Sequence, residues 1–281
     1  MSIASLLLTA CEGKQAAVSS TSAPVHDRPL VVASNYPLYF FASEIAGDSI
    51  EVVLPEFEGD PAGWRPDAEA VALMQSADQV VLNGAGYEAW LSWVTLSAER
   101  LMDTSAGFRD RLIPLSDETV HQHGPQGEHS HTGMAFTTWL DPALAVEQAR
   151  AIEQSFAGLA PEHAALFKSN LGDLTARLES LDAALSDAFS GFRDQPLVFS
   201  HPVYQYLESR YGLDGISLHW EPGEDPGVLG WTDLQKMLRR HPAKMMLWED
   251  QPLAATSERL AEHGIVSVTF VTASNRPAAG D

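Results

Sequence analysis

The stretch EHAALFKSNLGDLTARLESLDAALSDAF, residues 162–189, decides the fold, because it carries a long and regular helical pattern. Its apolar side chains recur at alternating intervals of four and three residues, at Phe167, Leu171, Leu174, Leu178, Leu181 and Leu185. This spacing predicts one continuous helix with a single buried stripe. At about 1.5 Å per residue, roughly 28 helical residues would span about 40 Å, the scale of a whole domain. Such a helix can serve as a spine between two lobes.

The residues before this helix alternate between apolar runs of strand length and helical patterns. Strands are expected at Leu30–Ser34, Ile50–Leu54, Gln79–Asn83 and Ile113–Leu115, and helices at Leu38–Ala46 and Pro66–Ala77. Asp141-Pro142 opens a further helical run, which Pro161 interrupts. Strands that alternate with helices indicate a parallel sheet with helical crossovers.

The residues after Pro196 begin the same alternation again. Strands are expected at Leu197–Ser200, Gly215–Leu218, Met245–Trp248 and Val266–Val271, and helices at Pro202–Tyr211, Trp231–Arg240 and Ser257–His263. We therefore predict an α/β fold with two parallel-sheet lobes, residues 30–160 and 194–281, joined by one long helix over residues 161–193.

The charge of the chain argues against several classes of partner. Asp and Glu number 38 against 17 Lys and Arg, which gives a net charge of −21. This charge disfavours binding to nucleic acid or to an anionic lipid surface. The single cysteine, Cys11, provides neither a disulfide framework nor a thiolate metal cluster.

The surroundings of Cys11 resemble a bacterial lipoprotein signal. An apolar run ends in Leu8-Thr9-Ala10-Cys11, and the polar residues 12–29 that follow are rich in Ser, Ala, Thr and Gln, as a flexible tether is. We expect residues 1–11 to be the signal segment and Cys11 to be lipidated, although a basic n-region is not seen. The alternative is a free cysteine after a chance apolar stretch. No other apolar run approaches the roughly 20 residues of a membrane-spanning helix.

Several segments together resemble one family, the metal-binding solute receptors of ABC transporters that handle zinc and manganese. They are ADQVVLNGAGYEAWL (residues 77–91), WLDP (139–142), RYGL (210–213) and the long helix, and the similarity extends from Pro29 to Thr272. The resemblance implies two α/β lobes joined by a rigid helix, with the ligand held in the cleft between them.

The resemblance also implies four metal-ligand positions, usually three histidines and one carboxylate, and most of them are replaced here. Ala62 and Thr137 stand where the family has its first two histidines, and Val271 or Thr272 stands where it has an aspartate. His201, in VFSHPVYQYLESRYGL, keeps the third histidine. A lone imidazole cannot hold Zn²⁺ or Mn²⁺ tightly, because these ions need several converging nitrogen or oxygen donors.

A histidine-rich loop over residues 121–131 is one candidate to supplement the site. Its imidazoles belong to His121, His123, His129 and His131. Two H-x-H pairs on a flexible chain can converge on one zinc ion, and zinc receptors of this family carry similar loops. The alternative is a solvated polar loop without a bound metal.

Acidic residues near predicted strand ends are a second candidate. Glu249 and Asp250 follow one strand of the second lobe, and Glu221 together with His219 follows another. Ligands of open α/β sheets bind outside the carboxyl ends of the strands. We expect Glu249 and Asp250 as metal ligands and Glu221 in the cleft, with solvation or structural hydrogen bonding as the alternative for each.

Aromatic residues suggest a different ligand. Trp64, Trp139 and Trp220 fall in segments expected to border the cleft, as does Thr137. Aromatic walls suit an organic molecule or a chelated metal better than an aqua ion. Packing in the core is the alternative for each tryptophan.

The sequence thus predicts an extracytoplasmic solute-binding lipoprotein, anchored through Cys11 in the periplasm or on the outer face of the cytoplasmic membrane. We expect a monomer that captures zinc or a related divalent ion and delivers it to a permease and its ATPase. A receptor for a metal chelate or organic ligand, and an accessory lipoprotein that buffers metal, remain alternatives. We do not expect an enzyme, because the usual catalytic motifs are missing and Ser200 beside His201 is not placed as a nucleophile with its base.

Overall fold

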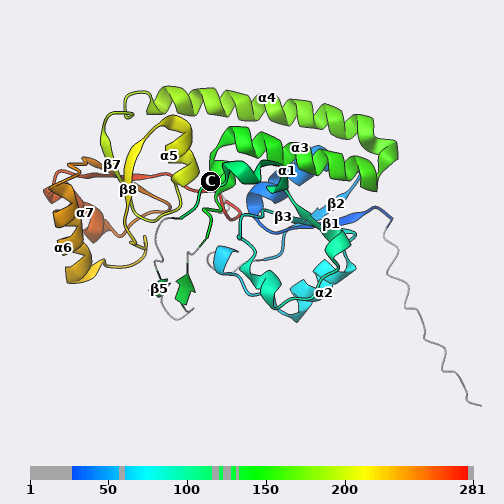
Figure 1. The fold of residues 1–281 in the computed structure, drawn as a ribbon, viewed down its shortest axis with the longest axis horizontal. Coiled ribbons are helices and arrows are strands. Elements are labelled where there is room, and N and C mark those ends of the chain that lie inside the picture. The colour runs from blue at the N-terminus through cyan, green and yellow to red at the C-terminus, as the bar shows by residue number, and fades with distance from the viewer. Residues whose placement is uncertain (1–26, 57–60, 116–119, 123–127, 131–132, 278–281) are drawn as a thin grey trace, which may run out of the picture.

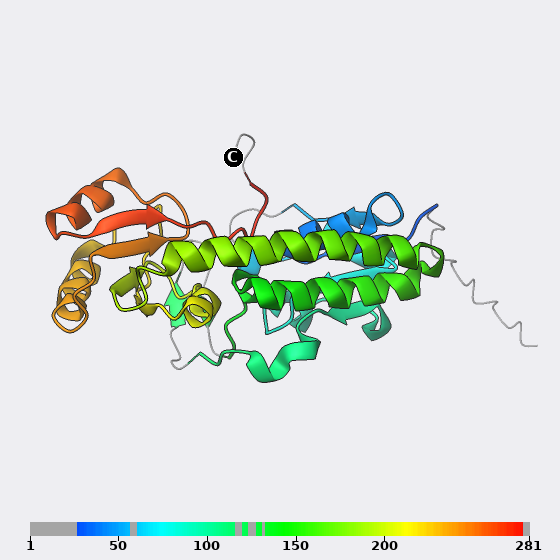
Figure 2. The same cartoon turned by 90° about the horizontal axis from the view of Figure 1, so that it is seen from above.

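The expected long helix is present in the computed structural model, which describes residues 27–56, 61–115, 120–122, 128–130 and 133–277. Helix α4 (Ala164–Phe189) runs along both lobes, as Figure 1 and the view from above in Figure 2 show. Phe167, Leu174 and Leu178 are buried on one face of the helix, as predicted. Leu181, however, is 49% exposed, so the apolar stripe is not buried along its whole length.

Packing against the preceding helix explains why the first part of the α4 stripe is buried and Leu181 is not. Helix α3 (Pro142–Leu159) begins at Asp141, whose side chain accepts a hydrogen bond from the backbone N–H of Ala143. It lies alongside α4 and has 18 residues against 26 in α4. The C-terminal part of α4 therefore continues past α3 towards the second lobe, where fewer neighbours cover it.

The first sheet has the order β2-β1-β3-β4, and all of its strand pairs are parallel. Its elements are β1 (Leu30–Ala33), α1 (Tyr36–Ala46), β2 (Glu51–Val53), α2 (Ala68–Ser76), β3 (Gln79–Leu82) and β4 (Leu101–Asp103). Helices α1, α3 and α4 share one apolar core with β1 and β3.

One strand of this sheet was predicted in the wrong place. Residues Ile113–Leu115 are not a strand, because Pro114 forms only an isolated bridge with Met134. The edge strand is β4, whose three residues are all half-buried. Its weak apolar pattern explains why the sequence did not reveal it.

The second sheet has the order β10-β9-β7-β8 and is also parallel throughout. Its elements are β7 (Pro196–Phe199), α5 (Gln205–Tyr211), β8 (Asp214–Ser217), α6 (Gly227–Leu238), β9 (Met245–Trp248), α7 (Ala254–Glu262) and β10 (Val266–Thr269). Helices α6 and α7 begin earlier than the sequence indicated, and β10 ends two residues sooner. The α/β fold with two parallel-sheet lobes and a long helix is confirmed.

The RYGL segment joins the second lobe to the long helix. The Arg210 guanidinium forms an ion pair with Asp182 of α4 and lies 3.5 Å from a carboxylate oxygen of Asp141. The hydroxyl of Tyr211 also donates to Asp182, at 3.0 Å. These hydrogen bonds lower the pKa of Asp182, so its carboxylate stays ionised at neutral pH. The motif therefore connects α5, α4 and the start of α3.

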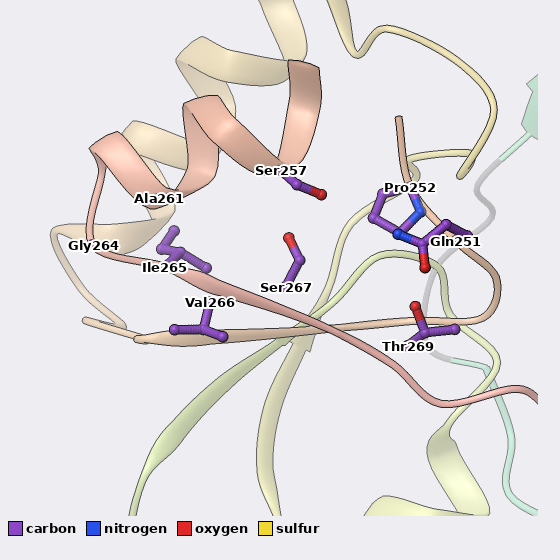
Figure 3. A pocket seen from close by; sticks show the side chains of 9 residues that line it. All are labelled: Gln251, Pro252, Ser257, Ala261, Gly264, Ile265, Val266, Ser267 and Thr269. Carbon is purple, nitrogen blue, oxygen red and sulfur yellow. The ribbon is translucent and has the colours of Figure 1, made fainter. Parts of the chain in front are cut away.

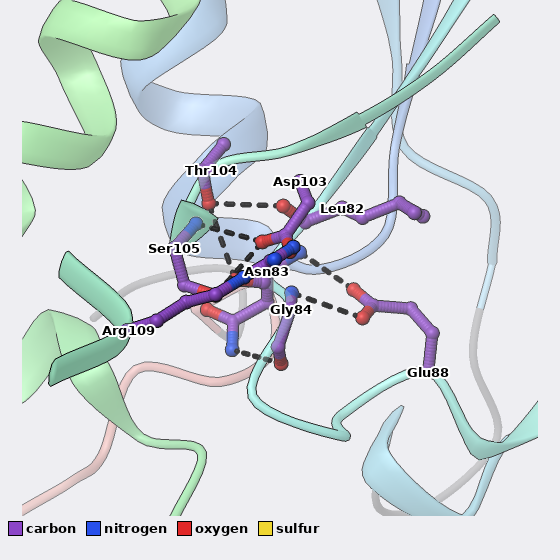
Figure 4. A network of polar contacts seen from close by, with 8 residues as sticks. All are labelled: Leu82, Asn83, Gly84, Glu88, Asp103, Thr104, Ser105 and Arg109. Carbon is purple, nitrogen blue, oxygen red and sulfur yellow. Dashed lines mark hydrogen bonds and ion pairs between the residues drawn. The ribbon is translucent and has the colours of Figure 1, made fainter. Parts of the chain in front are cut away.

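The NGAGYE segment forms a buried polar network at the carboxyl edge of the first sheet (Figure 4). The Glu88 carboxylate accepts hydrogen bonds from the Ser34 hydroxyl at 2.6 Å and from the backbone N–H groups of Asn83 and Gly84 at 2.6 and 3.1 Å. The Asn83 amide donates to the carbonyl of Phe136 at 2.8 Å. The network thus fixes the segment that leads to α3 against the first sheet.

Gly84 is required by this turn. Its φ of +75° lies in the left-handed region, and a Cβ at this position would come within 2.1 Å of a carboxylate oxygen of Asp103. Any larger residue would displace Asp103, whose carboxylate accepts hydrogen bonds from the backbone N–H and the hydroxyl of Ser105.

Among the described residues, no helix combines the length and the hydropathy that crossing a bilayer requires.

Replacing a buried residue of the α4 stripe is expected to destabilise the protein. Leu174→Ala removes a side chain that is 1% exposed and should lower the free energy of unfolding by about 3 kcal/mol. Leu181→Ala, on the same helix, should change it by less than about 1 kcal/mol because Leu181 is half-exposed. Urea titration followed by circular dichroism measures both. Equal losses would contradict the packing of α4 described here.

The Glu88 network should make stability depend on pH. Burial raises the pKa of Glu88 from 4.5 to about 7, so the folded state favours the protonated acid relative to the unfolded state. The contribution of protonated Glu88 to the free energy of unfolding is complete below pH 4.5 and is lost as the pH rises through about 7.

Glu88→Gln removes the titrating group and serves as the test. Between about pH 5.5 and 8, the free energy of unfolding of the wild type should fall by about 2 kcal/mol relative to the variant. Urea titrations of both proteins across this range measure the difference. A difference that stays constant with pH would refute this contribution of Glu88.

Candidate metal site

Three side chains with metal-binding atoms converge at the carboxyl edge of the second sheet. His201, Glu221 and Glu249 each offer one ligand atom, and these atoms lie within 4.8 Å of one another. Nδ1 of His201 is 3.2 Å from Oε1 of Glu221. The three residues follow β7, β8 and β9, which are adjacent and parallel. Among the residues that the structure describes, no second group of three such side chains is found.

His201 is held by the continuation of β7. The backbone N–H of Ser200 donates to the carbonyl of Leu247 at 2.8 Å, which extends the pairing between β7 and β9 to the residue before the histidine. The chain then turns, with the N–H of Val203 donating to the carbonyl of His201 at 2.9 Å. The side chain is buried, with 5% of the residue exposed. His201 therefore occupies a fixed position at the strand end.

Glu221 is placed by an extended segment that follows β8. The N–H groups of Leu218 and Trp220 each donate at 2.8 Å to carbonyls at the end of β7. The Trp220 ring packs against Trp231 and Trp248, with ring centroids 4.9 and 6.1 Å away. Because successive side chains of an extended chain point to opposite sides, burial of Trp220 directs Glu221 away from this core.

Glu249 follows β9 directly, and its backbone is fixed by the neighbouring strand. The N–H of Phe270 donates to the carbonyl of Trp248 at 2.7 Å. Burial, together with the negative charge of Glu249, raises the pKa of Tyr204, whose hydroxyl donates to the carbonyl of Phe270 at 2.6 Å. Tyr204 is therefore a neutral hydrogen-bond donor beside Glu249.

The three donors suit a divalent transition-metal ion. Imidazole nitrogen and carboxylate oxygen bind zinc at about 2.0–2.2 Å, so donors on a tetrahedral ion lie roughly 3.4 Å apart. The His201 and Glu221 atoms already have nearly this separation. Two ionised carboxylates balance the charge of one divalent cation, which offsets the cost of their partial burial.

The positions that carry metal ligands in the resembling family have other contacts here. Ala62 packs against the apolar core between the lobes. The Thr137 hydroxyl donates to the carbonyl of Val203 at 2.6 Å, and the Trp139 indole donates to the carbonyl of Thr272 at 2.7 Å. Val271 is 63% exposed. Thr137 and Trp139 thus form direct hydrogen bonds from the first lobe to the segments that follow β7 and β10.

Other residues singled out from the sequence lie elsewhere. Asp250 is exposed, and its carboxylate accepts a hydrogen bond from the backbone of Gln251. The ring of Trp64 packs edge-to-face on Trp90 of the first lobe, with centroids 5.8 Å apart. Neither residue belongs to the group of three donors, and their assignment as metal or ligand contacts stays a prediction.

The histidine-rich loop includes a short antiparallel hairpin. Strand β5 (Val120–Gln122) pairs with β6 (Glu128–Ser130), and His121 is directly opposite His129 in the register. His123 and His131 lie outside the described residues. The proposed role of the four histidines is therefore a prediction.

A pocket in the second lobe lies apart from the three donors. It is bounded by α7 and β10, and Figure 3 shows Ser257, Ser267 and Thr269 around it. None of the three donor residues lines this pocket.

The sequence predicted His201 and Glu249 as ligands, and it placed Glu221 in the cleft, among the acidic candidates near the strand ends. The signal that could have placed Glu221 beside His201 is the tripeptide His219-Trp220-Glu221 at a predicted strand end. A tryptophan between two polar residues indicates one buried side chain and two that face the opposite side.

Comparison with known proteins agrees with the fold. The zinc-binding lipoprotein AdcA of Streptococcus pneumoniae (strain R6) is 26% identical over 267 residues, covering 93% of this chain and 51% of AdcA. The high-affinity zinc uptake system protein ZnuA of Bacillus subtilis is 25% identical over 269 residues, covering 91% of this chain and 81% of that protein. The chain thus spans about half the length of the pneumococcal relative.

A solved structure and a family model extend this similarity. Zn(II)-bound AdcA from Streptococcus pneumoniae matches with a TM-score of 0.77 at 22% identity, over 90% of this chain and 54% of that one. The family model described as zinc-uptake complex component A, periplasmic, matches residues 31–279. Since this match covers most of the sequence, the chain belongs to the family of the periplasmic component A of zinc-uptake complexes.

Proposed function

We propose that this protein is the metal receptor of an ABC transporter and that it binds zinc or a related divalent ion through His201, Glu221 and Glu249. The observation that carries the proposal is the convergence of these three donors at the ends of adjacent strands. The names of the relatives, a zinc-binding lipoprotein and a zinc uptake protein, support zinc as the ion. Two carboxylates among the donors also permit manganese, which favours oxygen ligands.

The location and partners follow from the same proposal. The receptor is lipidated at Cys11, acts outside the cytoplasm as a monomer, and delivers its metal to a permease and its ATPase. It binds its cargo without transforming it. In support, Ser200, the serine beside His201, is fully buried and therefore not reachable by a substrate.

Neutralising Glu249 should weaken metal binding, whereas neutralising its neighbour should not. The wild type should bind one Zn²⁺ more tightly than about 10 µM, a free energy of roughly −7 kcal/mol. Glu249→Gln should weaken binding by roughly 100-fold, about 3 kcal/mol, because it removes a charged donor. Isothermal titration calorimetry with Zn²⁺ and with Mn²⁺ measures both values.

Asp250→Asn is the matched control for this experiment, because it removes the same charge from the adjacent residue, which is exposed. It should leave the affinity within about threefold of the wild type, as expected for a screened surface charge. Equal effects of the two substitutions, or a wild type with no affinity better than about 10 µM, would rule out this site.

Cys11→Ser tests the proposed anchor. Wild-type protein expressed in a bacterium should incorporate radiolabelled palmitate and fractionate with membranes, because lipid attachment requires the thiol. The variant should carry no label and appear in the soluble extracytoplasmic fraction. Labelled Cys11→Ser protein would show that the lipid is attached elsewhere or that the signal has been misidentified.

A further inference from the structure

The three proposed donors leave a tetrahedral ion one ligand short. A zinc site that holds its metal without open positions has four protein ligands. His201, Glu221 and Glu249 all come from the second lobe. The family positions of the first lobe carry Ala62 and Thr137, and the Thr137 hydroxyl is hydrogen-bonded to a backbone carbonyl. Neither of these two positions therefore supplies a fourth donor.

His219 lies on the same side of its segment as Glu221. The two residues flank Trp220, which is 5% exposed and packs against Trp231 and Trp248. The hydrogen bonds of Leu218 and Trp220 to the end of β7 keep this segment extended. In an extended chain, residues two apart point to the same side. Because Glu221 reaches His201, the His219 side chain is also directed towards His201.

The two imidazole rings have a geometry close to that of two ligands on one ion. Their centroids are 5.9 Å apart and their planes are 88° from parallel. With a zinc–nitrogen distance of about 2.0–2.1 Å, two imidazoles on a tetrahedral ion have ring centroids roughly 5 Å apart. His219 lies outside the group whose ligand atoms are within 4.8 Å of one another, so its exposed side chain must move towards the other three for a ring nitrogen to reach the ion.

We infer that His219 supplies the fourth metal ligand, so that the whole coordination sphere comes from the second lobe. This inference rests on the proposed function. His201 is buried and the two carboxylates are half-buried, whereas His219 is exposed. His219 therefore stands on the solvent side of the site and is the ligand through which the ion enters and leaves. Metal capture then needs no donor from the first lobe.

Full-length His219→Ala tests the inference by two measurements. Zn²⁺ affinity, measured by competition with a chromophoric chelator, should fall by 10-fold to 100-fold. The visible absorption of the Co²⁺-loaded protein should also weaken, because water would replace the imidazole and the ion would take a five- or six-coordinate geometry. His163→Ala is the matched control, since His163 is a half-exposed histidine at the turn between α3 and α4. It should leave affinity and spectrum unchanged.

The outcomes separate this inference from the proposed function. If His201→Ala abolishes binding while His219→Ala retains the wild-type affinity and Co²⁺ spectrum, the role of His219 is refuted and the three-donor site remains. If the wild type binds no metal, or His201→Ala binds as the wild type does, the proposed function fails and the inference fails with it. Circular dichroism of the His219→Ala protein should match the wild type, because an exposed side chain contributes little to folding.

Discussion

The parallel pairing of β8, β7 and β9 is the constraint on which the proposed site depends. Parallel strands end at the same edge of a sheet, so the residues that follow them meet there. His201, Glu221 and Glu249 come from positions far apart in the sequence, yet each lies within four residues of the end of one of these strands. The rest of the second lobe keeps that edge in place. The tryptophan core of Trp220, Trp231 and Trp248 fixes the segment after β8, and α4 fixes the lobe relative to the first sheet.

In the proposed site, the first lobe supplies no charged ligand and instead holds segments of the second lobe in place. Its buried network around Glu88 and Asn83 holds the segment before α3. From that segment, Thr137 and Trp139 donate to backbone carbonyls of the second lobe. These contacts join the lobes through neutral hydrogen bonds. In the proposed arrangement the metal site lies at the edge of the second sheet, and His201 is the one donor that also stands at a ligand position implied by the resemblance.

Much of the fold could be predicted from the sequence, because it depends on regular apolar patterns. The strands at Leu30 and Met245 are buried runs, and α4 shows a clear helical period. The predictions of strands and buried residues failed where the apolar pattern is weak or where burial depends on neighbours from other elements. Strand β4 is half-buried, and exposure of Leu181 depends on where α3 begins. The replacement of ligands that the resemblance implies was predicted from the sequence, whereas the alternation in His219-Trp220-Glu221 was the only sequence signal for the meeting of Glu221 with His201. This meeting depends on which side of the extended segment Trp220 occupies, and burial of that ring is decided by Trp231 and Trp248.

Anomalous diffraction tests the central claim most directly. Crystals should be grown from protein that has never been exposed to a chelator, and data should be collected on both sides of the zinc absorption edge. The account predicts one strong peak at about 2.0–2.2 Å from donor atoms of His201, Glu221 and Glu249, beyond the ends of β7, β8 and β9. A peak bound by residues of the first lobe, or zinc held only by the histidine-rich loop over residues 121–131, would contradict it.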